Sequence, residues 1–266
     1  MVGTFEADRV CSTTGLALTK AAGRVIWRVQ KSSYGALNPL VPDNRSEVGQ
    51  WGRWDVLGHR TIYGSNNALG AYLETLQSFR LDPHNSPKLS ELFDPDPEIR
   101  EGETLLEAVT EEWGICFSFK PGLIPGSWRG ERSLYKLRLP QDGWLVDVGH
   151  GESVGTIGRQ IQSQLEALDI TKLTLAEVYG ASRAVTAAIA EWIHSVVLDD
   201  GSLPLGILYD SKWGNDQACY AIWLRAVDDG KETTSEPTKL VDTQSIDWDS
   251  ADFKGAMRRH NLRRAF

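Results

Sequence analysis

The sequence has few of the residues that would place it in an oxidising compartment or in a membrane. Its three cysteines, Cys11, Cys116 and Cys219, are odd in number and far apart, which predicts a reducing compartment rather than a disulfide framework. No uninterrupted apolar run approaches the length of a membrane-spanning helix. Residues 1–19 mix charged with small side chains and lack the apolar core of a signal peptide. We therefore expect a cytoplasmic protein that does not enter a membrane.

Basic residues are also in the minority. Lys and Arg number 28 against 36 Asp and Glu, which gives a net charge of −8 and an isoelectric point near 5.2. A surface of this sign does not attract nucleic acid through its bulk charge, although a local basic pocket is compatible with it. Hydrophobic residues make up 41% and charged residues 24% of the chain, so we expect a folded core and exclude global disorder.

Common metal and cofactor motifs are missing. The five histidines are scattered, with no H-E-x-x-H pattern and no C-x-x-C pair, so we expect no metal site. No G-x-x-x-x-G-K-[ST] segment occurs, which excludes a P-loop. The glycines at 149, 151 and 155 approach a dinucleotide-binding fingerprint, but they include one residue too many and lack an acidic residue after a following strand.

Segments with strand-like and helix-like patterns follow one another without regular alternation. Short apolar or alternating runs predict strands at residues 24–29, 61–63, 133–139, 143–148, 206–209 and 219–224. Apolar periodicity and N-cap side chains predict helices at residues 68–79, 104–113, 156–168 and 175–197. We interpret residues 1–23 as a loosely ordered lead-in, 81–103 as an irregular surface segment and 210–216 as a polar loop. The mixture predicts a single α+β domain rather than a doubly wound sheet.

One short motif is compatible with serine chemistry. Residues 151–155 read G-x-S-x-G directly after an expected strand and before an expected helix, as a nucleophile elbow requires. Asp199 or Asp200 and then His260 follow in the chain order of an acid and a base. However, no strand–helix alternation precedes the motif and no HGGG-type oxyanion loop occurs. A serine hydrolase built on Ser153 is kept as an alternative, and a glycine-rich strand-to-helix turn is favoured.

Four other side chains have ordinary interpretations when each is taken alone. Arg53 lies between two tryptophans, as a stacked surface arginine would, and Tyr63 fits the core of a strand. Glu74 lies about 150° from the centre of the apolar stripe of its predicted helix, which leaves it facing water or a cleft. Ser211 is typical of a turn.

Taken together, these four residues resemble the RES domain family, which is named for its Arg, Glu and Ser. The matching blocks are GQWGRWDVLGHRTIYGSNNALGAYLETL (49–76), SRAVTAAIAEWI (182–193), GILYDSKWG (206–214) and the strand CYAIW. The first block is the most specific. The resemblance covers about residues 24–226, and the segment at about 82–130 and the polar C-terminal tail 227–266 are additions. The family's usual glutamine after the threonine of the long helix is absent, since Ala187 follows Thr186.

The resemblance implies an ADP-ribosyltransferase-like fold, in which two small, mostly antiparallel sheets form a cleft flanked by helices. It also implies an enzyme that cleaves NAD as its substrate, without a metal, by hydrolysis, phosphorolysis or ADP-ribosyl transfer. Many members act as toxins that a helix-turn-helix antitoxin holds inactive. We expect no direct contact with nucleic acid, and homo-oligomer formation is left open. A second alternative is a non-catalytic RES-like module that binds a nucleotide or a partner protein.

Site residues carry over from the resemblance one by one. Arg53 would grip the pyrophosphate of NAD with paired donors, and Arg28 would be a second anchor. Tyr63 would stack on the nicotinamide or ribose. Glu74 would stabilise the positive charge that develops on the ribose when nicotinamide leaves. Ser211 would hold the nicotinamide amide or the ribose, and Asn215 would be a further NAD-binding residue. The expected catalytic residues are therefore Arg53, Tyr63, Glu74 and Ser211.

Overall fold

The computed structural model describes residues 7–80 and 122–264, so the helix expected at 104–113 lies outside the described residues. Nine strands form one sheet in the order β1-β2-β7-β8-β9-β4-β3-β6-β10, and β11 and β5 form a separate parallel pair. The strands are β1 Arg9–Val10, β2 Ala17–Lys20, β3 Val25–Lys31, β4 Thr61–Ser65, β5 Leu123–Ile124, β6 Arg132–Arg138, β7 Trp144–Asp147, β8 Gly206–Ser211, β9 Gly214–Trp223, β10 Lys239–Ser245 and β11 Arg263–Arg264. All six strands that the sequence predicts are confirmed as β3, β4, β6, β7, β8 and β9.

The large sheet has two parts that meet at one residue pair. Trp27 of β3 and Ser65 of β4 are the paired residues that connect them. On one side, β4 pairs with β9, and the sheet continues through β8, β7, β2 and β1. On the other side, β3 pairs along its length with β6, which pairs with β10. The two small sheets implied by the resemblance are therefore joined into one sheet here.

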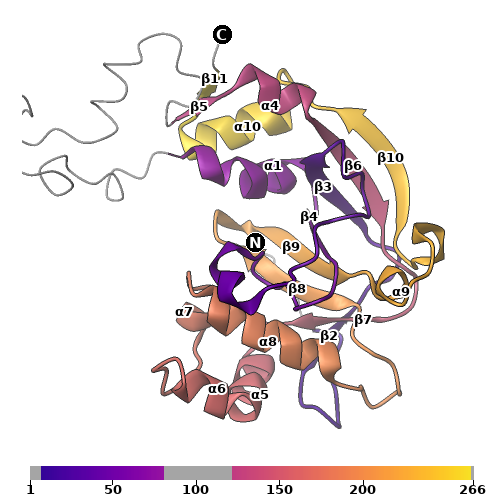
Figure 1. Ribbon diagram of the computed structural model, residues 1–266, viewed down its shortest axis with the longest axis vertical. Helices are drawn as coiled ribbons and strands as arrows, with labels where there is room; N and C mark the ends of the chain where they lie inside the picture. Colours follow the sequence, from indigo (N-terminus) through magenta and orange to yellow (C-terminus); the bar gives the residue numbers. More distant parts are fainter. Residues whose placement is uncertain (1–6, 81–121, 265–266) are drawn as a thin grey trace, which may run out of the picture.

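Helices cover this sheet at both ends, which confirms the α+β class. They are α1 Ala68–Leu76, α4 Gly126–Gly130, α5 Gly151–Gln160, α6 Gln162–Glu166, α7 Leu175–Val178, α8 Arg183–Ser195, α9 Arg225–Asp228 and α10 Ala251–His260, with short 3-10 turns at Arg45–Gln50, Gln77–Phe79 and Thr233–Ser235. Figure 1 shows α1 and α10 together at one end of the molecule and α5, α6 and α8 at the other. A separate apolar cluster fills each end, around Leu73 and Phe253 in the first and around Ile157 and Ile189 in the second.

Helix α1 begins where the sequence predicts it and packs closely on β4. Asn67 caps it, because its side-chain oxygen accepts a hydrogen bond from the Gly70 backbone nitrogen at 2.8 Å. A Cβ at Gly70 would lie 2.0 Å from the Ser65 hydroxyl oxygen. Only glycine fits at this contact, and the contact sets α1 against the strand that carries Tyr63.

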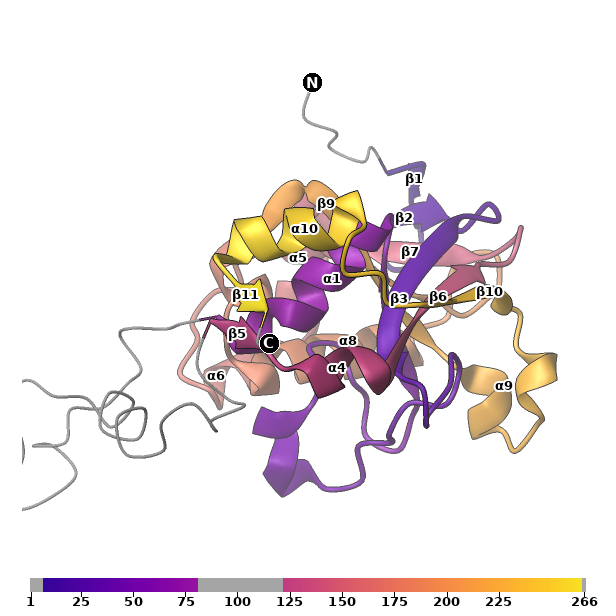
Figure 2. The ribbon, with the colours of Figure 1, turned by 90° about the horizontal axis from the view of Figure 1, so that it is seen from above.

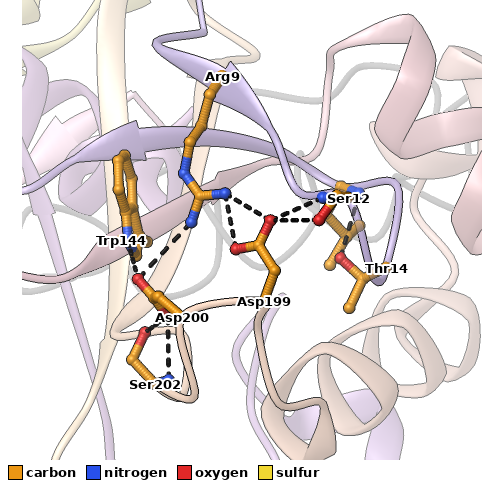
Figure 3. A network of polar contacts seen from close by, with 8 residues as sticks. Arg9, Ser12, Thr14, Trp144, Asp199, Asp200 and Ser202 are labelled. Carbon is orange, nitrogen blue, oxygen red and sulfur yellow. Dashed lines mark hydrogen bonds and ion pairs between the residues drawn. The ribbon is translucent and has the colours of Figure 1, made fainter.

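The expected loose lead-in is wrong for residues 9–20, which form β1 and β2. Leu16 and Leu18 are fully buried, so this segment closes the core under α5. Figure 3 shows how its charged end is fixed. The Arg9 guanidinium donates to Asp199 at 2.7 Å and lies 3.6 Å from Asp200. The hydrogen bond from Arg9 holds the pKa of Asp199 below its usual value. These long-range contacts leave no local pattern in the sequence.

Two further expectations of local structure are corrected. The single helix expected at 175–197 is broken into α7 and α8, because the Ser182 side chain caps a new helix by accepting from the Val185 backbone nitrogen. The loop expected at 210–216 is mostly strand, since β8 and β9 extend into a tight hairpin. The polar C-terminal segment, in turn, supplies β10 at the sheet edge and α10 beside α1.

Candidate functional site

A cavity of about 210 Å³ lies between the two parts of the sheet, where β3 and β4 diverge from their single pair. Four of the residues singled out in the sequence line it: Arg28 on β3, Arg53 in the loop before β4, Tyr63 on β4 and Glu74 on α1. The fifth, Ser211, is joined to Glu74 by a hydrogen bond. The fold therefore brings these five predicted site residues, which are far apart in the sequence, together at one cavity.

The Glu74 carboxylate is fixed from one side. The Ser211 hydroxyl donates to Glu74 Oε1 at 2.6 Å, and it accepts from the Trp213 backbone nitrogen at 3.1 Å, so its proton is directed to the carboxylate. The Cys219 thiol lies 3.7 Å from the same oxygen. Burial raises the pKa of Cys219, and the nearby Glu74 raises it further, which keeps the thiol protonated as a donor. We call Glu74, Ser211 and Cys219 the carboxylate cluster.

Tyr63 presents its ring to the cavity while its hydroxyl is already engaged. The hydroxyl donates to Asp55 Oδ1 at 2.6 Å and accepts from the Trp54 backbone nitrogen at 2.9 Å. Burial raises the pKa of Tyr63 well above its usual value, and the adjacent Asp55 adds to this. The phenol therefore stays neutral, and Tyr63 offers a flat wall rather than a proton.

Four basic side chains line the same cavity: Arg28, Arg53, Arg183 and Lys212. We call them the cationic set. No carboxylate of the described residues lies within 4.0 Å of any of their nitrogens. In a chain with a net charge of −8, this local excess of positive charge is a specific feature of the cavity.

Their hydrogen-bond partners in the described chain are backbone carbonyls. Arg28 is 5% exposed and donates to the Tyr63 carbonyl at 3.2 Å, while its buried Nε has no partner among the described residues. Arg53 and Lys212 both donate to the carbonyl of Gly180, each at 3.0 Å. A buried cation without a counter-charge is unfavourable, so an anion that enters the cavity would relieve this cost.

Burial, and for some of these cations the charge of a neighbouring cation, weakens their protonation. Burial lowers the pKa of Arg28 to about 10. The pKa of Lys212 falls to about 8, first through burial and then through the charges of Arg53 and Arg183. The Lys212 ammonium therefore loses its proton in a range close to neutral pH, whereas the guanidinium groups keep theirs.

Asn215 does not join the site. It is exposed on β9 and does not line the cavity, so the structure does not bring it together with the other residues predicted to bind NAD. Conversely, Arg183 and Lys212 were missed as site residues. Both lie inside the blocks that carry the family resemblance, Arg183 directly after the Ser182 cap and Lys212 directly after Ser211. A search of those blocks for further cations would have found them.

The serine hydrolase alternative is wrong, because its three groups are separated and engaged elsewhere. Ser153 is fully buried in the first turn of α5, where its hydroxyl accepts from the Ala17 backbone nitrogen at 3.0 Å. His260 Nε2 lies 2.8 Å from the Leu73 carbonyl, and Asp199 is paired with Arg9. The G-x-S-x-G match therefore marks the start of a helix, close to the favoured strand-to-helix turn.

Comparison with known proteins gives one loose structural likeness. Neither a family model nor a curated protein matches the sequence. The crystal structure of the M. tuberculosis MbcT–MbcA toxin–antitoxin complex contains a chain with 12% sequence identity, a TM-score of 0.42 and 84% of each chain covered. At this TM-score the superposition establishes neither a shared family nor a shared activity.

Within residues 7–80 and 122–264, no three His, Cys, Asp or Glu side chains are arranged to hold a metal ion. In the same ranges, every helix is too short or too polar to span a bilayer.

Proposed function

We propose that this protein binds NAD in the cavity between the two parts of the sheet and breaks the bond between nicotinamide and ribose. The observation that carries this proposal is the arrangement of the cavity. Four cations that have no carboxylate of the described residues within 4.0 Å line the same space as Glu74, a carboxylate that Ser211 holds in place. NAD combines a pyrophosphate, which needs cations, with a ribose that becomes positively charged as its glycosidic bond breaks.

The cationic set accounts for binding. The buried Nε of Arg28 has no hydrogen-bond partner among the described residues. Arg53 and Lys212 both donate to the Gly180 carbonyl, and a phosphate oxygen could replace that carbonyl as their acceptor. Guanidinium groups bind phosphate oxygens through paired donors, and the lysine adds a point charge. Tyr63 supplies the flat surface on which the nicotinamide or the ribose stacks.

Glu74 accounts for the chemistry. The C1′–N bond breaks with its electron pair passing to nicotinamide, which leaves as a neutral molecule, and the ribose acquires oxocarbenium character. A fixed carboxylate beside that ribose stabilises the developing charge without having to reorganise. A nucleophile, which is water, phosphate or a protein side chain, then forms a bond to C1′ and gives up its proton. We infer that Ser211 positions Glu74 rather than contacting the nicotinamide amide, because its hydroxyl proton is already directed to Oε1.

We further propose that NAD consumption makes the protein a toxin that a helix-turn-helix antitoxin holds inactive. The resemblance of residues 49–76 to RES domains supports this proposal. We expect a neighbouring gene to encode a small helix-turn-helix protein. When that protein is added to the purified protein described here, NAD loss should stop. NAD loss that continues with that protein in excess contradicts the proposed partner.

The test of the activity is incubation of the purified protein with NAD, with and without phosphate, followed by quantification of nicotinamide. We expect release in at least one buffer, and the sugar product then identifies the acceptor. Arg53→Ala should raise the KM for NAD more than it lowers kcat. Arg45→Ala, which removes an exposed arginine paired with Glu191, is the matched control and should change neither constant. Tight nucleotide binding without any release would instead identify a non-catalytic binding module.

A further inference from the structure

Helix α10 contacts both elements that hold the carboxylate cluster. His260 Nε2 lies 2.8 Å from the carbonyl of Leu73, the residue that precedes Glu74 on α1. The His260 ring also meets the ring of Trp213 edge-on, with the centroids 5.0 Å apart. Trp213 is the residue whose backbone nitrogen donates to Ser211. The buried His260 thus contacts both the residue that precedes Glu74 and the residue whose backbone nitrogen donates to Ser211.

The neighbouring residue makes a second connection. Arg259 donates two hydrogen bonds to Asp216 on β9, with lengths of 3.1 and 2.8 Å. This pair lowers the pKa of Asp216 to about 2, chiefly through the hydrogen bond from Arg259. Asp216 lies on the hairpin that carries Ser211, and Lys212 and Asn215 on the same hairpin are exposed. Arg259 therefore anchors a part of the hairpin that is otherwise largely in solvent.

Helix α10 lies alongside α1 (Figure 2), and side-chain contacts between the two helices keep it there. Tyr72 of α1 meets Phe253 of α10 edge-on, with ring centroids 5.1 Å apart. A Cβ at Gly255 would lie 3.2 Å from a methyl group of Leu69, so glycine permits the two helices to approach. Helix α10 is thus a fixed support for α1 rather than a mobile addition.

We propose that Arg259 and His260 are positioning residues for the proposed reaction. They hold α1 and the β8–β9 hairpin at the spacing that brings the Ser211 hydroxyl to Glu74 Oε1. The catalytic part of this proposal rests on the proposed NAD cleavage. It places the C-terminal segment, which the family resemblance does not cover, inside the functional unit.

The expected effect is on the rate of reaction rather than on stability. An ion pair that is partly exposed, as Arg259 and Asp216 are, contributes little to the stability of the fold. A catalytic group displaced by 1 Å, in contrast, can cost about a hundredfold in rate. Loss of the pair should therefore lower kcat while the melting temperature and the KM for NAD stay close to those of the wild type.

A charge exchange tests this inference. Arg259→Ala and Asp216→Ala should each lower kcat for nicotinamide release by about fivefold to twentyfold. The double exchange Arg259→Asp with Asp216→Arg should restore most of the rate. Lys254→Ala is the matched control, because Lys254 lies on the same helix as Arg259 but pairs with Asp249, which precedes that helix, rather than with a residue of the hairpin. It should leave kcat unchanged.

A second pair of variants tests the histidine. His260→Gln keeps a hydrogen-bond donor near the Leu73 carbonyl, whereas His260→Phe keeps only the ring contact with Trp213. If the polar contact positions Glu74, kcat falls more in the Phe variant than in the Gln variant. Equal wild-type rates in both variants overturn the role of His260.

Amide hydrogen exchange gives a measurement that does not depend on turnover. Exchange of the hairpin amides, above all that of Trp213, should accelerate in Arg259→Ala and return to the wild-type rate in the charge exchange. A wild-type kcat in Arg259→Ala overturns the catalytic inference, whatever the exchange rate. If the wild type releases no nicotinamide, the proposed function fails, and the exchange rates alone then decide whether α10 fixes the hairpin.

Discussion

The carboxylate cluster and the cationic set face the same cavity but are built in opposite ways. Glu74 Oε1 has two side-chain donors, and one of them, Ser211, is itself fixed by a backbone donor. The four cations have backbone carbonyls at best as hydrogen-bond partners, and no carboxylate of the described residues lies within 4.0 Å of their nitrogens. The hydrogen bonds on the carboxylate side of the cavity are already formed in the free protein, whereas on our proposal the cationic side gains its ion-pair partner only when an anion binds.

This difference separates chemistry from binding. A group that must stabilise charge at the moment of reaction is most effective when its hydrogen bonds are already formed. Cations that have no ion-pair partner in the free protein instead lower its stability, and binding of an anionic ligand offsets this loss of stability. Changes in the carboxylate cluster should therefore act on kcat, and changes in the cationic set on affinity and on stability.

The largest expected effect comes from Glu74→Gln. The amide keeps the volume of the side chain and an oxygen that can accept from Ser211, but it removes the negative charge beside the ribose. We expect kcat for nicotinamide release to fall by about a thousandfold or more, with the KM for NAD within about threefold of the wild type. Steady-state kinetics at saturating NAD measure this effect. A loss in kcat of less than tenfold would show that Glu74 does not stabilise the transition state.

The placement of Glu74 could be predicted from the sequence because its signals are local. The helical period places Glu74 away from the apolar stripe, which predicted that it faces water or a cleft, and Asn67 marked the start of its helix. The hydrogen bond between Glu74 and Ser211, by contrast, joins residues that are 137 positions apart. It depends on the pairing of β8, β9 and β4, for which no single segment carries a signal, and only the family resemblance connected the two residues.

The support by α10 could not be predicted in the same way. Residues 227–250 are polar, and β10 is exposed along its whole length, so no apolar alternation marks it as a strand. His260 is buried through contacts with α1 and the hairpin, which the sequence of α10 does not specify. The N-terminal strands were missed for a related reason. They are short, β2 pairs with the distant strand β7, and the Arg9 side chain of β1 is held by the distant Asp199.

An intermediate effect is expected from Arg28→Met, which replaces a buried cation with an apolar side chain of similar length. Without ligand, the variant should melt a few degrees above the wild type, because removal of a buried, uncompensated charge stabilises the folded state by about 1–4 kcal/mol. Its KM for NAD should rise by about tenfold to a hundredfold. Thermal unfolding with and without NAD checks both effects, because saturating NAD should reverse the order of the two melting temperatures. A variant that melts below the wild type without ligand would mean that the bond from Arg28 to the Tyr63 carbonyl outweighs the cost of its burial.

The smallest effect is a pH dependence that originates in the cationic set. The pKa of Lys212 is lowered to about 8, so its ammonium is charged below that pH and neutral above it. Because NAD, the proposed substrate, is an anion, kcat/KM for NAD should be highest below pH 8 and fall by up to about tenfold by pH 9. Lys212→Arg should remove this fall, because a guanidinium stays charged throughout this range, even beside Arg53 and Arg183. Initial rates at low NAD concentration between pH 6.5 and 9.5 measure the profile. If Lys212→Arg keeps the wild-type profile, another group titrates, and Lys212 does not contact the anion.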